Sequence, residues 1–436
     1  MNVCRTRHRS SHASWLPFCY ILWSVASCVA GAFTAGTNNS PFVSAAWYTG
    51  WHYNDVPLAN VSWSKYTHMS YAFATTIPNA PFVALDPSDS PKLTQFVAQA
   101  HQNGVKATLA IGGWTSSRWF SYGVGSATNR TQFATAVAQL ISTYKLDGID
   151  FEQVSLPLWE FPTSAGIGCN AFSPNDTNNY LAFLRELRQS SSGSNAIISL
   201  AVSTKPFNDS SGQAADLSEF SKVIDFIEIM DYDIKSSLSV GAGPSSPLND
   251  TCAPSGARFG SAVSAVEAWV GAGIPADQIV LGVPGYGRSF AVTPSDAFLD
   301  AGAKTLASYP QYNPKLQKAG DKWDGGWGVD VCGNVQGPGG TYNYWSLIDE
   351  GILDQNGTVR GGISYRYDNC SQTPFAYDPK AQLLISFENP TSLKAKGQFI
   401  KTSGLKGFAM WEAGSDYHDV LLDAMSMCGT DPVLAS

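Results

Sequence analysis

Short apolar runs alternate along the chain with longer stretches in which apolar residues recur every three or four positions. The short runs are rich in Ala, Val, Ile and Phe, which is typical of strands buried on both faces of a sheet. They lie at Ser44–Trp47, His68–Ala74, Ala107–Ile111, Gly148–Phe151, Ile197–Val202, Val223–Met230, Ile279–Val283 and Gly407–Met410.

The stretches between these runs show helical periodicity. In Asn129–Lys145, apolar side chains at Phe133, Val137, Leu140 and Ile141 fall on one stripe. The segments NYLAFLRELRQ, GSAVSAVEAWVGAG and SLKAKGQFIKTSG behave similarly. Eight strands that alternate with helices predict the α/β class, as a (β/α)8 TIM barrel.

The connection between the seventh and eighth runs is too long for a simple loop. Residues from about 289 to 374 are rich in Gly, Tyr and Asp and contain hairpin-like pieces. Because long structureless loops are uncommon in compact domains, we expect a small α+β insertion lobe between strands 7 and 8. The expected domain covers residues 33–430 and includes this lobe.

Residues 1–32 resemble a secretory signal peptide. Three arginines precede the apolar run Trp15–Ala30, and Ala30-Gly31-Ala32 fits a cleavage site. A membrane anchor is the alternative, although Pro17 interrupts the run. We therefore expect an extracellular protein with no membrane partner, and triplets such as Asn129-Arg130-Thr131 predict that it is a glycoprotein.

Composition narrows the class of partner. The formal charge is −8, and loss of the three N-terminal arginines makes it −11, so we expect no nucleic-acid partner. Aromatic residues reach 12% with 13 Trp, while charged residues are only 14%. This balance fits a neutral polysaccharide whose sugar faces stack on rings, although many of the rings belong to the core. We expect a monomer.

Eight cysteines are present, and five lie beyond residue 32. Five thiols allow at most two disulfides, with one cysteine left over. The sequence has no CxxC and no Cys/His cluster, so we expect neither a metal site nor a cofactor.

Several expected strands end in polar or aromatic residues, and catalytic groups of such barrels lie at those ends. These ends are Tyr48-Thr49-Gly50-Trp51, Tyr71-Ala72-Phe73, Gly112-Gly113-Trp114, Asp150-Phe151-Glu152, Met230-Asp231-Tyr232-Asp233, Tyr286-Gly287-Arg288 and Trp411-Glu412. Acids surrounded by rings suit cleavage of a glycosidic bond, because carboxyl groups protonate the leaving oxygen and rings hold pyranoses.

These motifs resemble glycoside hydrolase family 18, the chitinase family, in its fungal secreted form. DGIDFE with WEFP resembles the family signature DxxDxDxE, MDYD resembles its M-x-Y-D, and GYGRSF and GFAMWE resemble its last two strand motifs. The resemblance covers nearly all of the chain after the signal peptide, in order. It implies a chitinase that cleaves β-1,4-linked N-acetylglucosamine polymers, with chitin or chito-oligosaccharides as partners.

The family mechanism is retaining and substrate-assisted: a glutamic acid protonates the glycosidic oxygen, and the sugar's own N-acetyl oxygen attacks the anomeric carbon. Carried over to this chain, the resemblance implies catalytic roles for Glu160, Glu152, Asp150, Tyr232 and Asp233. Asp150 is expected to share a proton with its neighbour. Expected substrate-binding residues are Trp411, Met230, Tyr48, Phe73, Trp114, Tyr286 and Arg288.

The end of the fourth strand departs from the family pattern. Side chains alternate along a strand, so Asp150 and Glu152 point the same way and the next inward residue is Val154, which cannot donate a proton. If Gln153–Leu158 is instead an inserted segment, Glu160 becomes the acid. A gene-model error is a third possibility, because codons for Gln-Val-Ser can resemble an intron donor site, and the extra residues would then come from an intron.

Two functions remain open at this stage, a secreted chitin hydrolase and a catalytically silent chitin-binding protein of the same fold. The disrupted motif makes weak hydrolysis the expectation. The resemblance also suggests disulfides from Cys169 to Cys252 and from Cys332 to Cys370, with Cys428 free.

Overall fold

The computed structural model describes residues 41–426, apart from 153–168, 212–214, 238, 240, 301 and 303. The expected signal peptide, Glu160 and Cys428 lie outside the described residues. No helix within the described ranges is long and apolar enough to cross a membrane.

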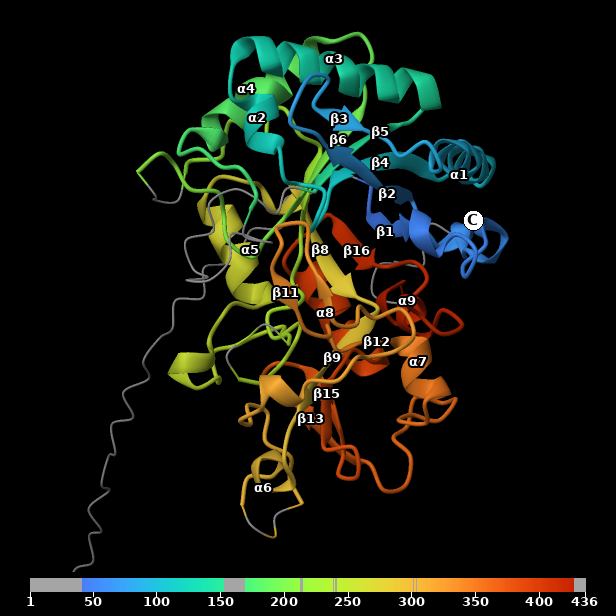
Figure 1. The fold of residues 1–436 in the computed structure, drawn as a ribbon, viewed down its shortest axis with the longest axis vertical. Coiled ribbons are helices and arrows are strands. Elements are labelled where there is room, and N and C mark those ends of the chain that lie inside the picture. The colour runs from blue at the N-terminus through green and yellow to red at the C-terminus, as the bar shows by residue number, and fades with distance from the viewer. Residues whose placement is uncertain are drawn as a thin grey trace, which may run out of the picture. The chain divides into compact units, whose positions relative to one another are not determined.

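Eight parallel strands close into a barrel, which confirms the predicted fold (Figure 1). The barrel strands are β1 (Val43–Thr49), β2 (His68–Thr76), β4 (Lys106–Gly112), β5 (Gly148–Glu152), β6 (Ile197–Val202), β7 (Phe226–Ile229), β8 (Ile279–Pro284) and β16 (Gly407–Trp411). Closure follows because β1 pairs with both β2 and β16. A short strand, β3 (Val83–Ala84), adds to β2 in the antiparallel sense.

Helices follow the barrel strands (Figure 1). They are α1 (Ser90–Gln102), α2 (Phe120–Val124), α3 (Ala127–Tyr144), α4 (Asp176–Gln189), α5 (Ala262–Gly271), α8 (Pro390–Thr402) and α9 (Val420–Ser426). Four of them, α3, α4, α5 and α8, lie where the apolar stripes predicted helices. Local sequence sets their starts: Ser261 and Ser264 form a capping box at α5, and Asn389 with Ser392 forms one at α8.

The insertion between β8 and β16 forms a second, antiparallel sheet. Its order is β12 (Thr341–Asn343), β9 (Tyr286–Ala291), β15 (Leu383–Ser386), β14 (Thr373–Asp378) and β13 (Ser364–Asp368). A hairpin of β10 (Gly328–Val329) and β11 (Val335–Gln336), with helices α6 (Pro294–Ala297) and α7 (Tyr344–Asp349), completes this lobe. Its own apolar core includes Phe290, Phe375, Tyr377 and Leu384.

One expected strand end belongs to the lobe instead. The sequence placed Tyr286-Gly287-Arg288 at the end of the seventh barrel strand, but β8 ends at Pro284 and these residues open β9. The chain changes sheet at Gly285, whose amide donates to the carbonyl of Trp411 at 2.7 Å. An added Cβ at Gly285 would lie 2.7 Å from the side chain of Ser415, so this close turn favours glycine.

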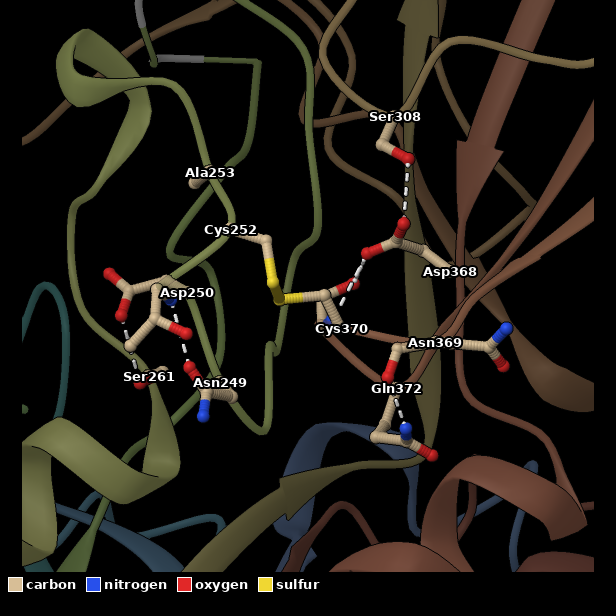
Figure 2. Close-up of a disulfide and its surroundings, with 12 residues drawn as sticks. Asn249, Asp250, Cys252, Ala253, Ser261, Ser308, Asp368, Asn369, Cys370 and Gln372 are labelled. Atoms are coloured by element: carbon tan, nitrogen blue, oxygen red, sulfur yellow. Dashed lines mark hydrogen bonds between the residues drawn. A yellow bond between two sulfur atoms is a disulfide. The ribbon is translucent and has the colours of Figure 1, made fainter. Parts of the chain in front are cut away.

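The predicted disulfide pairing is wrong. The bridges are Cys169–Cys332 and Cys252–Cys370, with Cα–Cα distances of 5.6 and 6.2 Å. Figure 2 shows the second, which ties the loop before α5 to the turn between β13 and β14. Each bridge joins a barrel loop to the lobe, because the lobe packs against these loops, whereas the prediction paired barrel with barrel and lobe with lobe.

Candidate active site

Two carboxyl groups point into the barrel from β5, as strand alternation predicted. Asp150 is fully buried, and its carboxylate accepts hydrogen bonds from Trp47 Nε1 at 2.8 Å and from Ser199 Oγ at 2.9 Å. Glu152 is 7% exposed, and its Oε2 has no hydrogen-bond partner among the described residues. Burial raises the pKa of Asp150, and burial together with the charge of Asp150 raises the pKa of Glu152 well above its usual value.

The strand end that carries Glu152 is fixed by β4. The carbonyl of Glu152 accepts from Gly113 N at 3.0 Å and from Ser117 Oγ at 2.8 Å. Gly112 has a φ of +115°, and an added Cβ would lie 2.2 Å from this carbonyl. The Gly112-Gly113 pair therefore lets the two strand ends approach closely enough to hold Glu152.

A third buried acid, Glu228 on β7, was missed by the sequence analysis. It is 3% exposed, and its carboxyl group interacts with that of Asp150. Burial, followed by the charge of Asp150, raises its pKa well above the usual value for glutamate. The signal was present, because Glu228 is the one charged residue in the apolar run Phe226–Met230.

Tyr232 lies just beyond β7 and beside these acids. Burial, followed by the charge of Glu152, raises its pKa well above 10, so its hydroxyl stays a hydrogen-bond donor at neutral pH. Its ring packs edge-on against Tyr286 at 6.3 Å, and Gly282 on β8 leaves the space that the Tyr232 ring fills. Met230 packs against the apolar interior of the barrel.

Asp233 forms a bidentate ion pair with Arg288 of β9. The distances from Arg288 Nε to Oδ1 and from Nη2 to Oδ2 are both 2.6 Å, and the Tyr286 hydroxyl donates to Oδ1 at 3.0 Å. Asp233 has a φ of +59°, a left-handed conformation that aspartate tolerates better than most residues. The lobe thus holds the segment that carries Tyr232.

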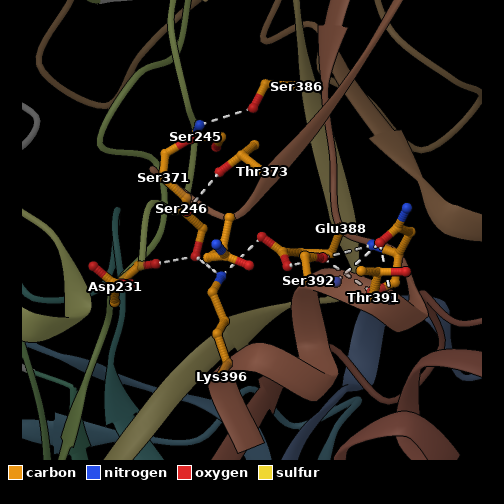
Figure 3. A network of polar contacts seen from close by, with 12 residues as sticks. Asp231, Ser245, Ser246, Ser371, Thr373, Ser386, Glu388, Thr391, Ser392 and Lys396 are labelled. Carbon is orange, nitrogen blue, oxygen red and sulfur yellow. Dashed lines mark hydrogen bonds and ion pairs between the residues drawn. The ribbon is translucent and has the colours of Figure 1, made fainter. Parts of the chain in front are cut away.

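A buried polar network holds the same segment from behind (Figure 3). Lys396 Nζ of α8 donates to Glu388 Oε1 at 2.8 Å and to Ser246 Oγ at 2.6 Å. The Ser246 hydroxyl in turn donates to the carbonyl of Asp231. Because Asp231 directly precedes Tyr232, this chain of contacts fixes the start of the segment to α8 and to the end of the lobe.

Four aromatic rings gather at the end of the barrel where the acids lie. Trp411 stacks on Phe73 with ring centroids 5.7 Å apart and an interplanar angle of 15°. Trp47 and Trp51 lie 5.8 and 6.4 Å from Trp411. Trp51, which is 55% exposed, was not among the residues predicted to bind sugar. Trp114 follows β4 and is 45% exposed.

Tyr48 was expected to bind sugar, and its position does not fit that role. It is 2% exposed, its ring packs on Phe96 of α1, and its hydroxyl donates to Val56 O at 2.6 Å. Alternation explains the error, because Trp47 points into the barrel and Tyr48 therefore points toward the helices. Its neighbour on the strand makes the contact with Asp150.

A second polar pair, also missed, lies beside the rings. His52 Nδ1 is 2.8 Å from Glu412 Oε1, and the His52 ring stacks on Trp323 of the lobe at 3.8 Å. No group of three or more His, Cys, Asp or Glu residues that could hold a metal ion occurs in the described ranges.

The site therefore combines buried acids whose pKa values are raised, a tyrosine hydroxyl and partly exposed rings. Protonated carboxyl and hydroxyl groups donate hydrogen bonds to neutral acceptors such as amide carbonyls. Indole and phenyl faces suit the apolar faces of pyranose rings. This chemistry fits an uncharged N-acetylated sugar better than a charged ligand.

The chain is similar to proteins that are named chitinases or chitinase-like. A relative from Moniliophthora roreri, named a chitinase-like effector, is 44% identical over 389 residues, covering 89% of this chain and 93% of the relative. The structure is similar to that of a chitinase from Rhizomucor miehei, with a TM-score of 0.77 and 31% identity over 88% of this chain and 99% of that one.

A class V chitinase from Nicotiana tobaccum, solved in complex with NAG4, shares the fold with a TM-score of 0.68 and 19% identity over 89% of this chain and 98% of that one. The family model described as glycosyl hydrolases family 18 matches residues 43–416. The chain therefore belongs to family 18 of the glycosyl hydrolases.

Proposed function

We propose that this protein binds oligomers of N-acetylglucosamine, as found in chitin, and hydrolyses them weakly or not at all. The observation that carries the proposal is where the row of acids on β5 ends. Glu152 ends β5 and is 7% exposed, and the residue two positions further along the chain is Val154, which has no proton to donate. A general acid acts only within hydrogen-bond reach of the leaving oxygen, and the buried Glu152 does not extend toward solvent.

Binding is supported by the parts of the site that the chain retains. Trp411 and Phe73 present stacked, half-buried rings, and Trp51 extends the aromatic surface toward solvent. Tyr232 and a protonated Glu152 supply donors for an acetamido carbonyl. A neutral, N-acetylated sugar satisfies both features at once.

The inserted segment Gln153–Leu158 supports weak hydrolysis. It separates Glu152 from the Trp159-Glu160 pair by six residues relative to the family spacing. Placing a carboxyl group within a fraction of an ångström is demanding, and a displacement of 1 Å can cost a hundredfold in rate. The name chitinase-like effector, given to the relative from Moniliophthora roreri, also favours a role other than digestion of chitin.

The second candidate is a working chitin hydrolase, with Glu160 as the proton donor. It is favoured by WEFP at residues 159–162, which matches the family motif once the insertion is removed. In that mechanism Glu152 and Tyr232 orient the acetamido group while Glu160 protonates the glycosidic oxygen. The two candidates share the binding surface and differ only in turnover.

Both candidates act outside the cell. The expected signal peptide at residues 1–32 supports export, and so do the two disulfides, because disulfides persist mainly in oxidising compartments.

Calorimetric titration of the purified chain with chitotetraose tests the proposal. We expect measurable binding, and a matched titration with cellotetraose, which lacks acetamido groups, should give much weaker binding. Equal affinity for both oligomers would contradict recognition of the acetamido group. Absence of binding to either would contradict the proposal as a whole.

A deletion variant that lacks Gln153–Leu158 tests the reason for weak turnover. We expect hydrolysis to increase by several powers of ten, because the deletion restores the spacing between Glu152 and Glu160. Glu160→Gln in the deletion background should abolish this activity and keep binding. If the folded deletion variant stays inactive, adding Glu152→Asp shows whether the longer side chain at position 152 is the cause.

A further inference from the structure

Glu228 and Glu152 lie in one layer of the barrel. Strand register aligns Glu152 of β5 with Ala201 of β6, and Ala201 with Glu228 of β7. Side chains from alternate strands form the interior layers of a TIM barrel, so both glutamates point inward at the same height. The residue between them in this register is Ala201, whose side chain is a single methyl group.

Asp150 lies one inward position deeper and connects the two glutamates. Its carboxylate accepts from Trp47 Nε1 and from Ser199 Oγ, and it interacts with the carboxyl group of Glu228. A hydrogen bond between two carboxyl groups requires a proton on one of them. No Lys, Arg or His in the described ranges forms an ion pair with any of the three acids.

The hydrogen bonds decide which acid carries the charge. Asp150 accepts from two side-chain donors, Trp47 and Ser199, whereas Glu228 Oε2 and Glu152 Oε2 have no partner among the described residues. A buried anion is stable where donors surround it, and an unpaired buried carboxyl group is stable only when protonated. This arrangement favours a proton shared between Asp150 and Glu228 over one shared between Asp150 and Glu152.

We propose that Glu228 is a positioning residue of the sugar site, which keeps its proton at neutral pH and donates it to the carboxylate of Asp150. The single negative charge of the three acids then stays on Asp150, deep in the barrel. Glu152 remains protonated, neutral and free of Asp150, with its unpaired oxygen beside Tyr232. This inference rests on the proposed function, because it assigns the donor at Glu152 to the acetamido carbonyl of a bound N-acetylglucosamine unit.

The direction of each pKa agrees with this assignment. Burial raises the pKa of all three acids, but the donors around Asp150 oppose the rise there, whereas Glu152 and Glu228 are raised well above the usual value. The hydroxyls of Tyr232 and Tyr180, which are the ionisable neighbours, remain protonated for the same reason.

Infrared difference spectroscopy of the ligand-free protein tests the proton on Glu228. The carbonyl stretch of a protonated carboxyl group is separate from the bands of a carboxylate. We expect the difference between the wild-type protein and Glu228→Gln at neutral pH to show loss of a protonated carboxyl band. Loss of carboxylate bands instead would show that Glu228 is ionised and would overturn the proposal. Glu267→Gln, an exposed position on α5, is the matched control, and the protonated band should not change in it.

Binding of chitotetraose to two variants tests the positioning role. Glu228→Gln keeps a donor for Asp150, so its affinity should stay within about threefold of wild type. Glu228→Leu removes the donor, and its affinity should fall about tenfold or more, the change expected when a hydrogen bond to a charged group is lost. Thermal melting verifies that each variant is folded. Equal affinities for wild type and Glu228→Leu would overturn the proposal, and so would an equally large loss in both variants.

The two measurements separate this inference from the proposed function. If the wild-type protein does not bind chitotetraose, the proposed function fails, and the infrared result still decides whether Glu228 holds a proton. If the protein binds and the infrared band is absent, only the role of Glu228 is wrong.

Discussion

The buried ion pair behind the Asp231–Asp233 segment gives the sharpest stability prediction. Lys396 and Glu388 have side chains that are 0% and 2% exposed, and their charged atoms are 2.8 Å apart. Lys396→Met keeps most of the side-chain volume and removes the charge. Glu388 then retains only the hydroxyl of Ser392 as a donor, at 2.6 Å.

The expected cost is large because one charge is left buried without its partner. Removing one member of a buried pair typically lowers the free energy of unfolding by about 3 to 5 kcal/mol. The double variant Lys396→Met/Glu388→Gln removes both charges and should recover most of this loss, since buried pairs contribute little against neutral replacements. The two single variants and the double variant form a thermodynamic cycle.

The stability lost in Lys396→Met should also depend on pH. Burial already raises the pKa of Glu388, and Lys396 opposes this rise. Without Lys396 the folded-state pKa of Glu388 rises further above its unfolded value. The stability difference between Lys396→Met and wild type is therefore smallest below the unfolded pKa and grows as pH rises through the folded pKa.

Urea unfolding monitored by tryptophan fluorescence measures each variant. A loss below about 1 kcal/mol for Lys396→Met at neutral pH would contradict this prediction, because that is the range of a surface pair. A double variant as unstable as the single one would refute it also. Chitotetraose binding by Lys396→Met should weaken, since Ser246 loses the contact that fixes it against Asp231.

Three further outcomes follow from the structure. Trp411→Ala should weaken chitotetraose binding by about 1 to 3 kcal/mol in calorimetry while the protein stays folded, and unchanged affinity would show that the ring only packs. Replacing Cys169 and Cys332 together by Ser should lower the free energy of unfolding by about 2 to 5 kcal/mol in urea, because the bridge spans 163 residues; no change would contradict a formed bridge. Burial raises the pKa of Asp416 to about 6, so its contribution to stability is full below about pH 4 and is lost by about pH 6. Asp416→Asn should remove about 3 kcal/mol of the pH dependence of the unfolding free energy across that window, and an unchanged pH profile of stability would contradict the raised pKa.

The fold was predictable because its signals are local. Strands buried on both faces give apolar runs, and the predicted run Ile197–Val202 has the bounds of β6. The amphipathic periodicity predicted a helix from Asn129, and α3 begins two residues earlier, at Ala127. The same local rule gave the inward pair Asp150 and Glu152.

The rest of the site depends on contacts between distant segments. The disulfides join residues 163 and 118 positions apart, and nothing local to a cysteine states its partner. The role proposed for Glu228 depends on the strand register through β6, which aligns Glu228 with Glu152. Tyr48 was misassigned because a strand end was treated as a unit, although alternate residues there face opposite sides.

We propose that this barrel binds a chitin oligomer without efficiently cleaving it. The most direct test is to saturate the unmodified protein with chitohexaose, as established by calorimetry, and to follow the length of the oligomer over time by mass spectrometry. We expect the hexamer to stay bound and intact over a period in which the variant lacking Gln153–Leu158 converts it to shorter products. Rapid conversion to shorter oligomers by the unmodified chain would contradict this expectation and would show that the inserted segment does not prevent Glu160 from acting.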